Sequence, residues 1–309
     1  MSSVLLKCVA CGSVGLDSAP GSYTCRHCGA IFHVLRGVPR FVSRETYAES
    51  FGMEWNRFSR TQLDSASGRP ESREAFLEKT GWKPEDLAGK VVLDAGCGMG
   101  RFAEICADFG AEVHAVDLSL AVEAAQGNLG GRTNVHIYQA DIMNLPFPDQ
   151  SFDVIYSIGV LHHTPDTRTA FLKLPPLLKP GGRIAVWVYD TGLRRFVGGE
   201  ILRLISWRLP RRWLMAASRV AIPLYRLHRI RYVGAVTTHL LPTSLHPIPE
   251  WRWLDTFDWY SPRYQWKHNG REVVRWFEEA NLVDIREGPF PTSVRGRRGV
   301  ESHPRRGRA

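Results

Sequence analysis

The feature that most constrains the fold is the stretch from Val91 to Phe102, which reads V-V-L-D-A-G-C-G-M-G-R-F. Val91, Val92 and Leu93 form a short apolar run, typical of a strand buried on both faces of a parallel sheet. Three glycines then allow a sharp turn and a close approach of the backbone to a ligand. A helix beginning at Arg101 would direct its positive N-terminal end at that ligand. The stretch therefore predicts a strand, a ligand-binding turn and a helix of an α/β fold.

The spacing of the glycines separates the ligands that such a turn can bind. A phosphate-binding P-loop requires G-x-x-x-x-G-K-[ST], and no lysine follows these glycines. A dinucleotide fingerprint, G-x-G-x-x-G, would need a glycine at the position of Arg101. The observed D-x-G-x-G-x-G resembles motif I of class I S-adenosylmethionine (SAM) methyltransferases, and a tight turn without a ligand is the alternative. The resemblance implies that Asp94 lies beside the ammonium group of the methionine moiety.

Later segments extend this resemblance in the order that the family has them. Asp117 ends the next expected strand, 23 residues after Asp94, where an acid binds a ribose diol. Asp141 follows a third strand, where methyltransferases of this kind bind the adenine amino group. The segments 149–157 and 178–183 match the fourth strand and the lead into the fifth.

The resemblance implies an α/β fold with a Rossmann-like, doubly wound sheet of seven strands over residues 91–294. A helix is expected over Arg271–Ala280, a sixth strand over Leu282–Ile285 and a last strand near Phe290–Val294. The residues expected to hold SAM are Asp94, Gly96, Gly98, Gly100, Asp117, Leu118, Asp141, Ile142 and Ile158.

Four of the six cysteines lie near the start of the chain, as Cys8-x2-Cys11 and Cys25-x2-Cys28. Two such pairs have the spacing of a four-thiolate zinc ribbon, and four thiolates leave no open position on the metal. A structural zinc is therefore predicted, with four reduced core cysteines as the alternative. Residues 1–43 resemble the small zinc-ribbon domain related to the tRNA-methyltransferase activator proteins.

Residues 44–90 are expected to form a linker with helices, one of them over Glu71–Thr80. Their string F-G-x-x-W-N-R-F-x-x-T-Q-L-D-S, beginning at Phe51, resembles a bacterial subgroup of methyltransferases labelled type 11. In class I methyltransferases this segment commonly folds over the SAM pocket. Packing on the flank of the domain is an equally supported interpretation.

An insertion at residues 191–250 separates the fifth strand from the sixth, and its residues 191–249 carry ten arginines against one acid, Glu200. Apolar residues recur at helical spacing from Phe196 to Ile205 and again from Trp213 to Leu227, where Pro223 should break or kink the helix. The insertion is interpreted as a helical substrate cap, and the alternative is a set of basic amphipathic helices on a membrane surface. Residues 295–309 are expected to be a basic, disordered tail.

Two histidines, His162 and His163, follow the fourth strand at the edge where ligands of α/β proteins bind. Histidine has the pKa range of a general base, which would take a proton from an oxygen or nitrogen nucleophile. The alternative for either residue is that it caps the next helix or lines the SAM pocket.

Three functions remain open: methyl transfer to a small molecule or glycan, methyl transfer to RNA, and a non-catalytic partner subunit with a SAM fold. The zinc ribbon and basic tail favour RNA, but the net charge of +9 comes from the insertion and tail, whereas the sheet domain is acidic. The intact motifs argue against a partner subunit. The sequence favours O-, N- or C-methylation of a small molecule or glycan, with nucleic acid disfavoured.

The composition, with 44% hydrophobic and 23% charged residues, is that of an ordinary globular protein. The chain starts without an apolar segment of secretory length, and no run of about 18 uncharged apolar residues occurs in it. These observations predict a cytoplasmic protein, peripheral at the membrane if the insertion binds lipid.

Overall fold

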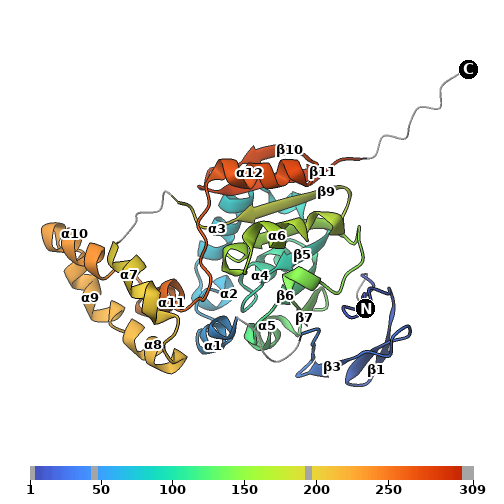
Figure 1. Ribbon diagram of the computed structural model, residues 1–309, viewed down its shortest axis with the longest axis horizontal. Coiled ribbons are helices and arrows are strands. Elements are labelled where there is room, and N and C mark those ends of the chain that lie inside the picture. Colours follow the sequence, from blue (N-terminus) through green and yellow to red (C-terminus); the bar gives the residue numbers. More distant parts are fainter. Residues whose placement is uncertain (1–3, 43–47, 192–196, 301–309) are drawn as a thin grey trace, which may run out of the picture.

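The computed structural model describes residues 4–42, 48–191 and 197–300. A seven-stranded sheet occupies its centre, in the order β10-β11-β9-β8-β5-β6-β7 (Figure 1). In chain order the strands are β5 (Val91–Ala95), β6 (Glu112–Asp117), β7 (Val135–Gln139), β8 (Phe152–Ile158), β9 (Leu178–Trp187), β10 (Leu282–Glu287) and β11 (Ser293–Arg298). Strands β5 to β9 pair in parallel, whereas β11 runs antiparallel to both of its neighbours. The predicted seven-stranded α/β fold is confirmed.

Helices cover both faces of this sheet, because its central strands are apolar on both sides. In β5, Val92 belongs to one hydrophobic core and Leu93 to the other, and both side chains are fully buried. One face carries α3 (Glu71–Thr80), α4 (Arg101–Asp108) and α5 (Ala121–Leu129). The opposite face carries α6 (Thr167–Leu172) and α12 (Gly270–Glu279).

A polar side chain caps the N-terminus of each of the two helices on that second face. The side chain of Asp166 accepts a hydrogen bond from the amide of Thr169 at the start of α6. Asn269 does the same for Glu272 at the start of α12. Such caps satisfy amides that have no partner within the helix. Short 3₁₀ helices complete the connections, namely η1 (Pro84–Asp86), η2 (Ile142–Asn144), η3 (Leu161–His163) and η4 (Pro175–Leu177).

The cysteine-containing segment forms a separate four-stranded antiparallel sheet, β1 (Leu16–Ala19), β2 (Ser22–Cys25), β3 (Ile31–Leu35) and β4 (Val38–Pro39). We call residues 4–41 the ribbon. It lies beside β7, the edge strand of the large sheet (Figure 1). The amide of Phe41 donates to the carbonyl of Gln139 at 2.8 Å, a distance typical of strand pairing, and Arg40 forms a parallel bridge with the same residue.

Residues 48–90 form α1 (Glu49–Arg57), α2 (Asp64–Ser67) and α3. The side-chain amide of Asn56 fixes α1 to the sheet domain, since it donates to the carbonyl of Leu120 at 2.9 Å. Helix α3 matches the predicted bounds and packs on the flank of the sheet, against α4 and β9. Residues 44–47 of the expected linker lie outside the described residues.

The insertion contains four short helices, α7 (Val197–Ser206), α8 (Arg211–Ser218), α9 (Ala221–His228) and α10 (Arg231–Leu240), which stand to one side of the sheet domain (Figure 1). The helix expected over Trp213–Leu227 is in fact two helices, and the break at residues 219–220 precedes Pro223. Proline is tolerated in the first turn of α9, where its missing amide has no intrahelical partner. Phe196 lies outside the described residues.

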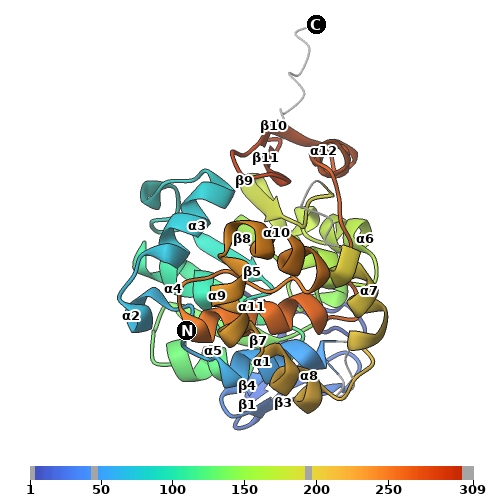
Figure 2. The same cartoon turned by 90° about the vertical axis from the view of Figure 1, so that its left-hand side faces the viewer.

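Helix α11 (Pro249–Tyr260) follows the insertion and lies in front of α1 and β5 when the molecule is viewed onto the inserted helices (Figure 2). Its aromatic residues Trp251, Phe257 and Tyr260 form a small core with residues of α8 and with Phe58, which directly follows the last residue of α1. Arg203 on α7 donates to the carbonyls of Trp259 at 2.9 Å and Pro262 at 3.1 Å. These bonds anchor the end of α11.

The last strand differs from its prediction. Strand β11 covers Ser293–Arg298, so residues assigned to a disordered tail, from Arg295 to Arg298, instead form the antiparallel strand. Arg297 and Arg298 are partly buried there, because β11 lies between β9 and β10. Residues 301–309 lie outside the described residues. None of the described helices is both long and apolar enough to cross a bilayer.

Candidate active site

The glycine turn after β5 meets the loop that follows β8. Gly96 has a φ of 101°, which favours glycine, and a Cβ built on it would overlap the side chain of Val160. The two loops approach because β5 and β8 are adjacent parallel strands whose carboxyl ends share one edge. The order of the strands reverses at this point, and α/β proteins bind ligands in the crevice that results.

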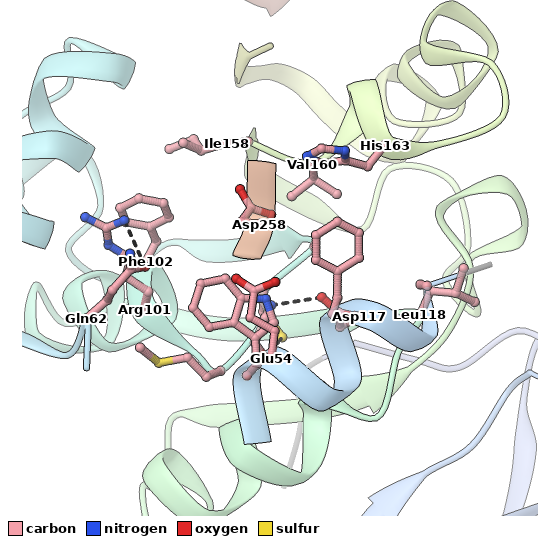
Figure 3. A pocket seen from close by; sticks show the side chains of 18 of the residues that line it. Glu54, Gln62, Arg101, Phe102, Asp117, Leu118, Ile158, Val160, His163 and Asp258 are labelled. Carbon is pink, nitrogen blue, oxygen red and sulfur yellow. Dashed lines mark hydrogen bonds between the residues drawn. The ribbon is translucent and has the colours of Figure 1, made fainter. Parts of the chain in front are cut away.

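A cavity of about 360 Å³ lies at this edge and is bounded by α1 and α11 (Figure 3). Eight of the eleven predicted cofactor and catalytic residues line it: Gly96, Gly98, Asp117, Leu118, Asp141, Ile142, Ile158 and His163. The other three, Asp94, Gly100 and His162, do not line it. The turn and the ends of four parallel strands therefore bring most of the predicted site together.

Asp94 lies at the base of the glycine turn and is only 2% exposed. Within the described part of the chain, its Oδ2 atom has no hydrogen-bond partner. Burial, together with the nearby charge of Asp117, raises the pKa of Asp94 to about 8. An orphaned buried acceptor beside this turn fits a ligand that brings a hydrogen-bond donor, as the ammonium of SAM would. Gly100 instead begins α4 and packs against Leu129.

Asp117 at the end of β6 is held by three donors. The amide of Gly98 donates to its Oδ2 at 2.9 Å (Figure 3), while the amide and hydroxyl of Ser119 donate to Oδ1 at 2.8 and 2.7 Å. Burial raises the pKa of Asp117, and these hydrogen bonds oppose that rise. The carboxylate is thus fixed at the cavity wall, where it can accept from a diol.

Asp141 lies between the end of β7 and the start of η2, and its Oδ1 accepts a hydrogen bond from the amide of Met143 at 2.9 Å. The apolar side chains of Leu118, Ile142 and Ile158 line the cavity around it. Leu118 is also tied to the sheet, because the side-chain amide of Gln139 donates to its carbonyl at 2.9 Å. An apolar slot with one acceptor at its end suits a heterocyclic base that carries an amino group.

The two histidines lie in different environments. His162 is fully buried, stacks on Tyr189 with ring centroids 3.9 Å apart and does not line the cavity. His163 lines the cavity, and its Nδ1 donates to the carbonyl of Tyr264 at 2.9 Å, so Nε2 is the acceptor of the neutral ring. Burial lowers the pKa of His163 to about 4 and that of His162 well below its usual value. His162 therefore has a packing role in this structure, and His163 is a weak base.

Sequence reasoning missed three carboxylates of the cavity. Glu54 comes from α1, and Asp255 and Asp258 come from α11. Burial raises the pKa of Asp255 to about 7 and that of Asp258 to about 6, and it raises the pKa of Glu54 well above its usual value. The sequence held one signal, since Glu54 and Asp258 directly precede Trp55 and Trp259, and Asp255 lies four residues before Trp259.

Two cations at the cavity were also missed. Arg101, the first residue of α4, donates to the side chain of Gln62 at 3.1 Å (Figure 3) and to that of Ser72 at 2.8 Å. Lys79 on α3 lies over the rings of Trp187 and Phe290, and burial lowers its pKa to about 8. Arg101 can hold an anionic group such as the carboxylate of an amino acid, because it lies at the positive end of α4.

The four predicted metal ligands converge in the ribbon. Their sulfur atoms all lie within 4.8 Å of one another, with 3.7 Å between Cys8 and Cys28 and 3.6 Å between Cys11 and Cys25. A tetrahedron with Zn–S bonds of about 2.3 Å has edges of about 3.8 Å. The amides of Gly12 and Gly29 donate to the carbonyls of Cys8 and Cys25, so both knuckles turn in the same way. The donor set fits zinc.

Comparison with known proteins supports the methyltransferase motifs. The profile of the methyltransferase domain matches residues 93–186. An uncharacterized methyltransferase of Mycobacterium bovis is 33% identical over 152 residues, which cover 47% of this chain and 76% of that protein. Phosphoethanolamine N-methyltransferase 1 of Arabidopsis thaliana is 33% identical over 50% of this chain and 31% of its own length. The O-methyltransferase cnsE of Penicillium expansum is 38% identical over 36% of this chain and 42% of its own length.

The chain thus spans less than half the length of the plant and fungal relatives, and their names differ in the atom that is methylated. The similarity to the Mycobacterium bovis protein covers three-quarters of that protein. That profile begins in β5 and ends in β9, the strands whose carboxyl ends form the cavity. The resemblance to class I SAM-dependent methyltransferases is therefore confirmed, and the chain belongs to the methyltransferase family.

Proposed function

We propose that this protein transfers a methyl group from SAM to a small molecule bound in the cavity. The single observation that carries the proposal is the convergence on one cavity of the glycine turn, Asp117 and Asp141 with polar groups of α1 and α11. The first three fit the cofactor, and the helices supply an acceptor side. A volume of about 360 Å³ is within the range of small-molecule sites.

In this proposal the residues act mainly by placement, since methyl transfer from a sulfonium is an in-line displacement. SAM supplies the activated methyl group. Asp117 and Asp141 would orient its ribose and adenine, while Asp94 and Arg101 would meet the ammonium and carboxylate of its methionine moiety. The aromatic rings of Phe51 and Trp55 on α1 would exclude water from the reacting atoms.

The same cavity argues against an RNA acceptor. Five acidic residues line it, namely Glu54, Asp117, Asp141, Asp255 and Asp258, and their carboxylates would repel an RNA backbone. A glycan acceptor remains compatible with the cavity, because its hydroxyls can donate to carboxylates. We also propose that Cys8, Cys11, Cys25 and Cys28 bind one structural zinc, on the basis of their sulfur geometry.

The test of the cofactor assignment is calorimetric titration of the full chain with SAM and with S-adenosylhomocysteine. We expect binding in the micromolar range, at least tenfold weaker in Asp117→Ala, because the ribose hydroxyls lose their acceptor. Asp149→Ala is the matched control, since Asp149 is exposed and lies away from the cavity. Equal affinities in Asp117→Ala and the wild type would contradict the assignment.

We further propose that the insertion contacts an anionic membrane surface. Large apolar side chains remain exposed on the packed helices α7 and α10, including Leu204 (66%), Tyr232 (76%) and Leu240 (65%). The exposed arginines of the same insertion are Arg208, Arg212, Arg219, Arg226, Arg229 and Arg231. Exposed apolar and basic side chains thus occur together in one helical insertion, as they do in helices that bind a membrane surface.

Co-sedimentation with vesicles of phosphatidylcholine, with and without phosphatidylglycerol, tests this contact. We expect binding to the anionic vesicles that weakens in a Leu204→Ser, Ile205→Ser double variant. Ile31→Ser on the ribbon removes an equally exposed apolar side chain and should leave binding unchanged. Binding that is the same to both vesicle types, or undiminished in the double variant, would remove the proposal.

A further inference from the structure

Glu54, Asp255 and Asp258 bring three carboxylates to one side of the cavity. Glu54 points from α1 and Asp258 from α11, on opposite sides of the same space (Figure 3). The two helices pack against each other, so this arrangement is built by the fold rather than by a loop. Asp255 lies one turn before Asp258 on α11.

Glu54 has no partner for its charge within the described part of the chain. Its side chain is 0% exposed, and neither carboxylate oxygen has a hydrogen-bond partner. The other two acids are partly satisfied, because the hydroxyl of Ser244 donates to Asp255 at 2.8 Å and that of Tyr189 donates to Asp258 at 3.2 Å. A buried carboxylate without donors is costly unless a ligand supplies them.

The nearby arginines offset this cluster only in part. Burial raises the pKa of both aspartates, and the charges of Arg101 on Asp255 and of Arg203 on Asp258 oppose that rise, whereas the charges acting on Glu54 are those of the two aspartates. Arg101 is hydrogen-bonded to Gln62 and Ser72, and Arg203 to backbone carbonyls at the end of α11. Among the described residues, no ion pair within 4.0 Å joins any of the three acids to a cation. The described groups with metal-ligand spacing do not include these acids either. No described side chain therefore pairs with Glu54, and a ligand that brings positive charge or hydrogen-bond donors would supply its partner.

Aromatic rings complete the surroundings of the three acids. Phe51, Trp55, Trp187, Tyr189 and Trp259 all line the same cavity. The faces of such rings attract a desolvated ammonium group and its methylated forms. Carboxylates and aromatic faces together select a cation over a neutral alcohol or an acid of the same size.

We propose that the methyl acceptor is a small-molecule amine, bound as its ammonium ion between Glu54 and Asp258 and against these aromatic rings. This inference rests on the proposed methyl transfer from SAM and specifies the class of its acceptor. It also assigns the acceptor side of the cavity to α1 and α11, which are separate from the strand ends that meet the cofactor.

The chemistry balances with these groups. A carboxylate of the cluster takes one proton from the ammonium, which frees the lone pair of the nitrogen. That lone pair forms the new N–C bond to the methyl carbon while the C–S bond breaks and its electron pair stays on sulfur. The products are a methylated ammonium ion and S-adenosylhomocysteine, and the proton leaves to solvent. Asp258, whose pKa is raised to about 6, matches this task better than His163, whose pKa is lowered to about 4.

The experiment uses the full chain saturated with S-adenosylhomocysteine and two probes of equal shape, choline and its uncharged carbon analogue 3,3-dimethylbutan-1-ol. Titration calorimetry should show choline binding at least tenfold more tightly than the alcohol. Glu54→Gln and Asp258→Asn should each weaken choline at least fivefold, with S-adenosylhomocysteine affinity changed less than threefold. Glu49→Gln, an exposed position on the same helix, should leave both affinities unchanged.

A second measurement follows turnover as the release of S-adenosylhomocysteine with matched small amines, alcohols and carboxylic acids. Only the amines should support release of S-adenosylhomocysteine, and the rate of that release should be lower in Glu54→Gln. Choline binding that is absent at millimolar concentration, no stronger than that of the alcohol, or undiminished in Glu54→Gln would overturn the inference. Methylation of the alcohols alone would also overturn it while leaving the proposed methyl transfer intact. Failure of S-adenosylhomocysteine to bind the wild type would instead overturn the proposed function.

Discussion

Gly96 and Val160 occupy the same small space at the carboxyl edge of the sheet. A Cβ on Gly96 would lie 2.8 Å from the Cβ of Val160 and closer still to its two methyl carbons. The adjacent loops of β5 and β8 can therefore meet only if residue 96 has no side chain, and its φ of 101° adds strain for any other residue.

Gly96→Ala should lower SAM affinity more than tenfold, because the turn must move away from Val160. Gly127→Ala is the matched control, since Gly127 lies in α5 with nothing within 4 Å of its added Cβ. That control should keep SAM affinity and raise the free energy of unfolding by about 0.5–1 kcal/mol, as alanine favours a helix. Calorimetry and chemical denaturation measure the two quantities. Wild-type affinity in Gly96→Ala would show that the turn does not approach the cofactor.

The buried Asp94 should make the ligand-free protein less stable as the pH rises from 6.5 to 8. Its pKa is about 8 in the folded protein, against about 3.9 in an unfolded chain. In this window the folded state holds more protons, so the free energy of unfolding falls, by up to about 1.4 kcal/mol per pH unit. The buried histidines are neutral in the folded protein but still partly protonated in the unfolded chain near pH 6.5, so they oppose this fall in the lower half of the window and add little slope toward pH 8.

Asp94→Asn should flatten this dependence, because the amide does not titrate. Denaturant unfolding at pH 6.5, 7.25 and 8 measures the slope. Asp255, with a pKa of about 7, contributes in the same direction in the lower half of the window. An unchanged slope in Asp94→Asn would mean that Asp94 is ionised in the folded protein across the whole range.

The ribbon should carry close to one zinc per chain when the protein is purified without chelator. Cys25→Ser should lose the metal and much of the stability of the ribbon, because metal binding and folding are coupled in such small domains. Cys106→Ala changes a buried cysteine of the sheet domain and should retain the zinc. Elemental analysis and thermal unfolding distinguish the variants. A well-folded ribbon with no metal would count against the assignment.

Arg40→Met should destabilise the junction between the ribbon and the sheet. Arg40 is 8% exposed and donates to Gln139 at 2.9 Å and to Glu123 at 3.2 Å. Loss of these buried bonds should cost about 1–3 kcal/mol of unfolding free energy. Arg36→Met removes an exposed partner of the same Glu123 and should cost at most about 1 kcal/mol. Equal losses of unfolding free energy in the two variants would show that the buried Arg40 stabilises the junction no more than the exposed Arg36 does.

The parts of the site that could be predicted from the sequence are those whose functional residues lie within one short, contiguous segment of the chain. The glycine turn and Asp117 belong to short strand–turn–helix units, so their spacing alone places them at the carboxyl edge. Glu54 and Asp258 are far apart in the chain and meet only because α11 folds back onto α1. No local pattern encodes that contact.

The boundaries of strands and the directions of side chains could not be predicted from the sequence either. His162 and His163 are adjacent, and only the packing of η3 against Tyr189 decides that the first is buried and the second lines the cavity. The strand predicted near Phe290–Val294 lies at Ser293–Arg298. Its arginines are accommodated there because the backbone of β11 pairs with both β9 and β10. A run of arginines alone resembles a disordered tail.

The position of the ribbon beside β7 has a consequence for the behaviour of the protein in a crowded solution. Strand β7 ends the large sheet, and the bridge between Arg40 and Gln139 covers part of its outer backbone. An uncovered edge strand is a template for pairing with other chains. A ribbon that unfolds without zinc would uncover this edge, so zinc depletion would drive self-association of the enzyme before its sheet domain unfolds.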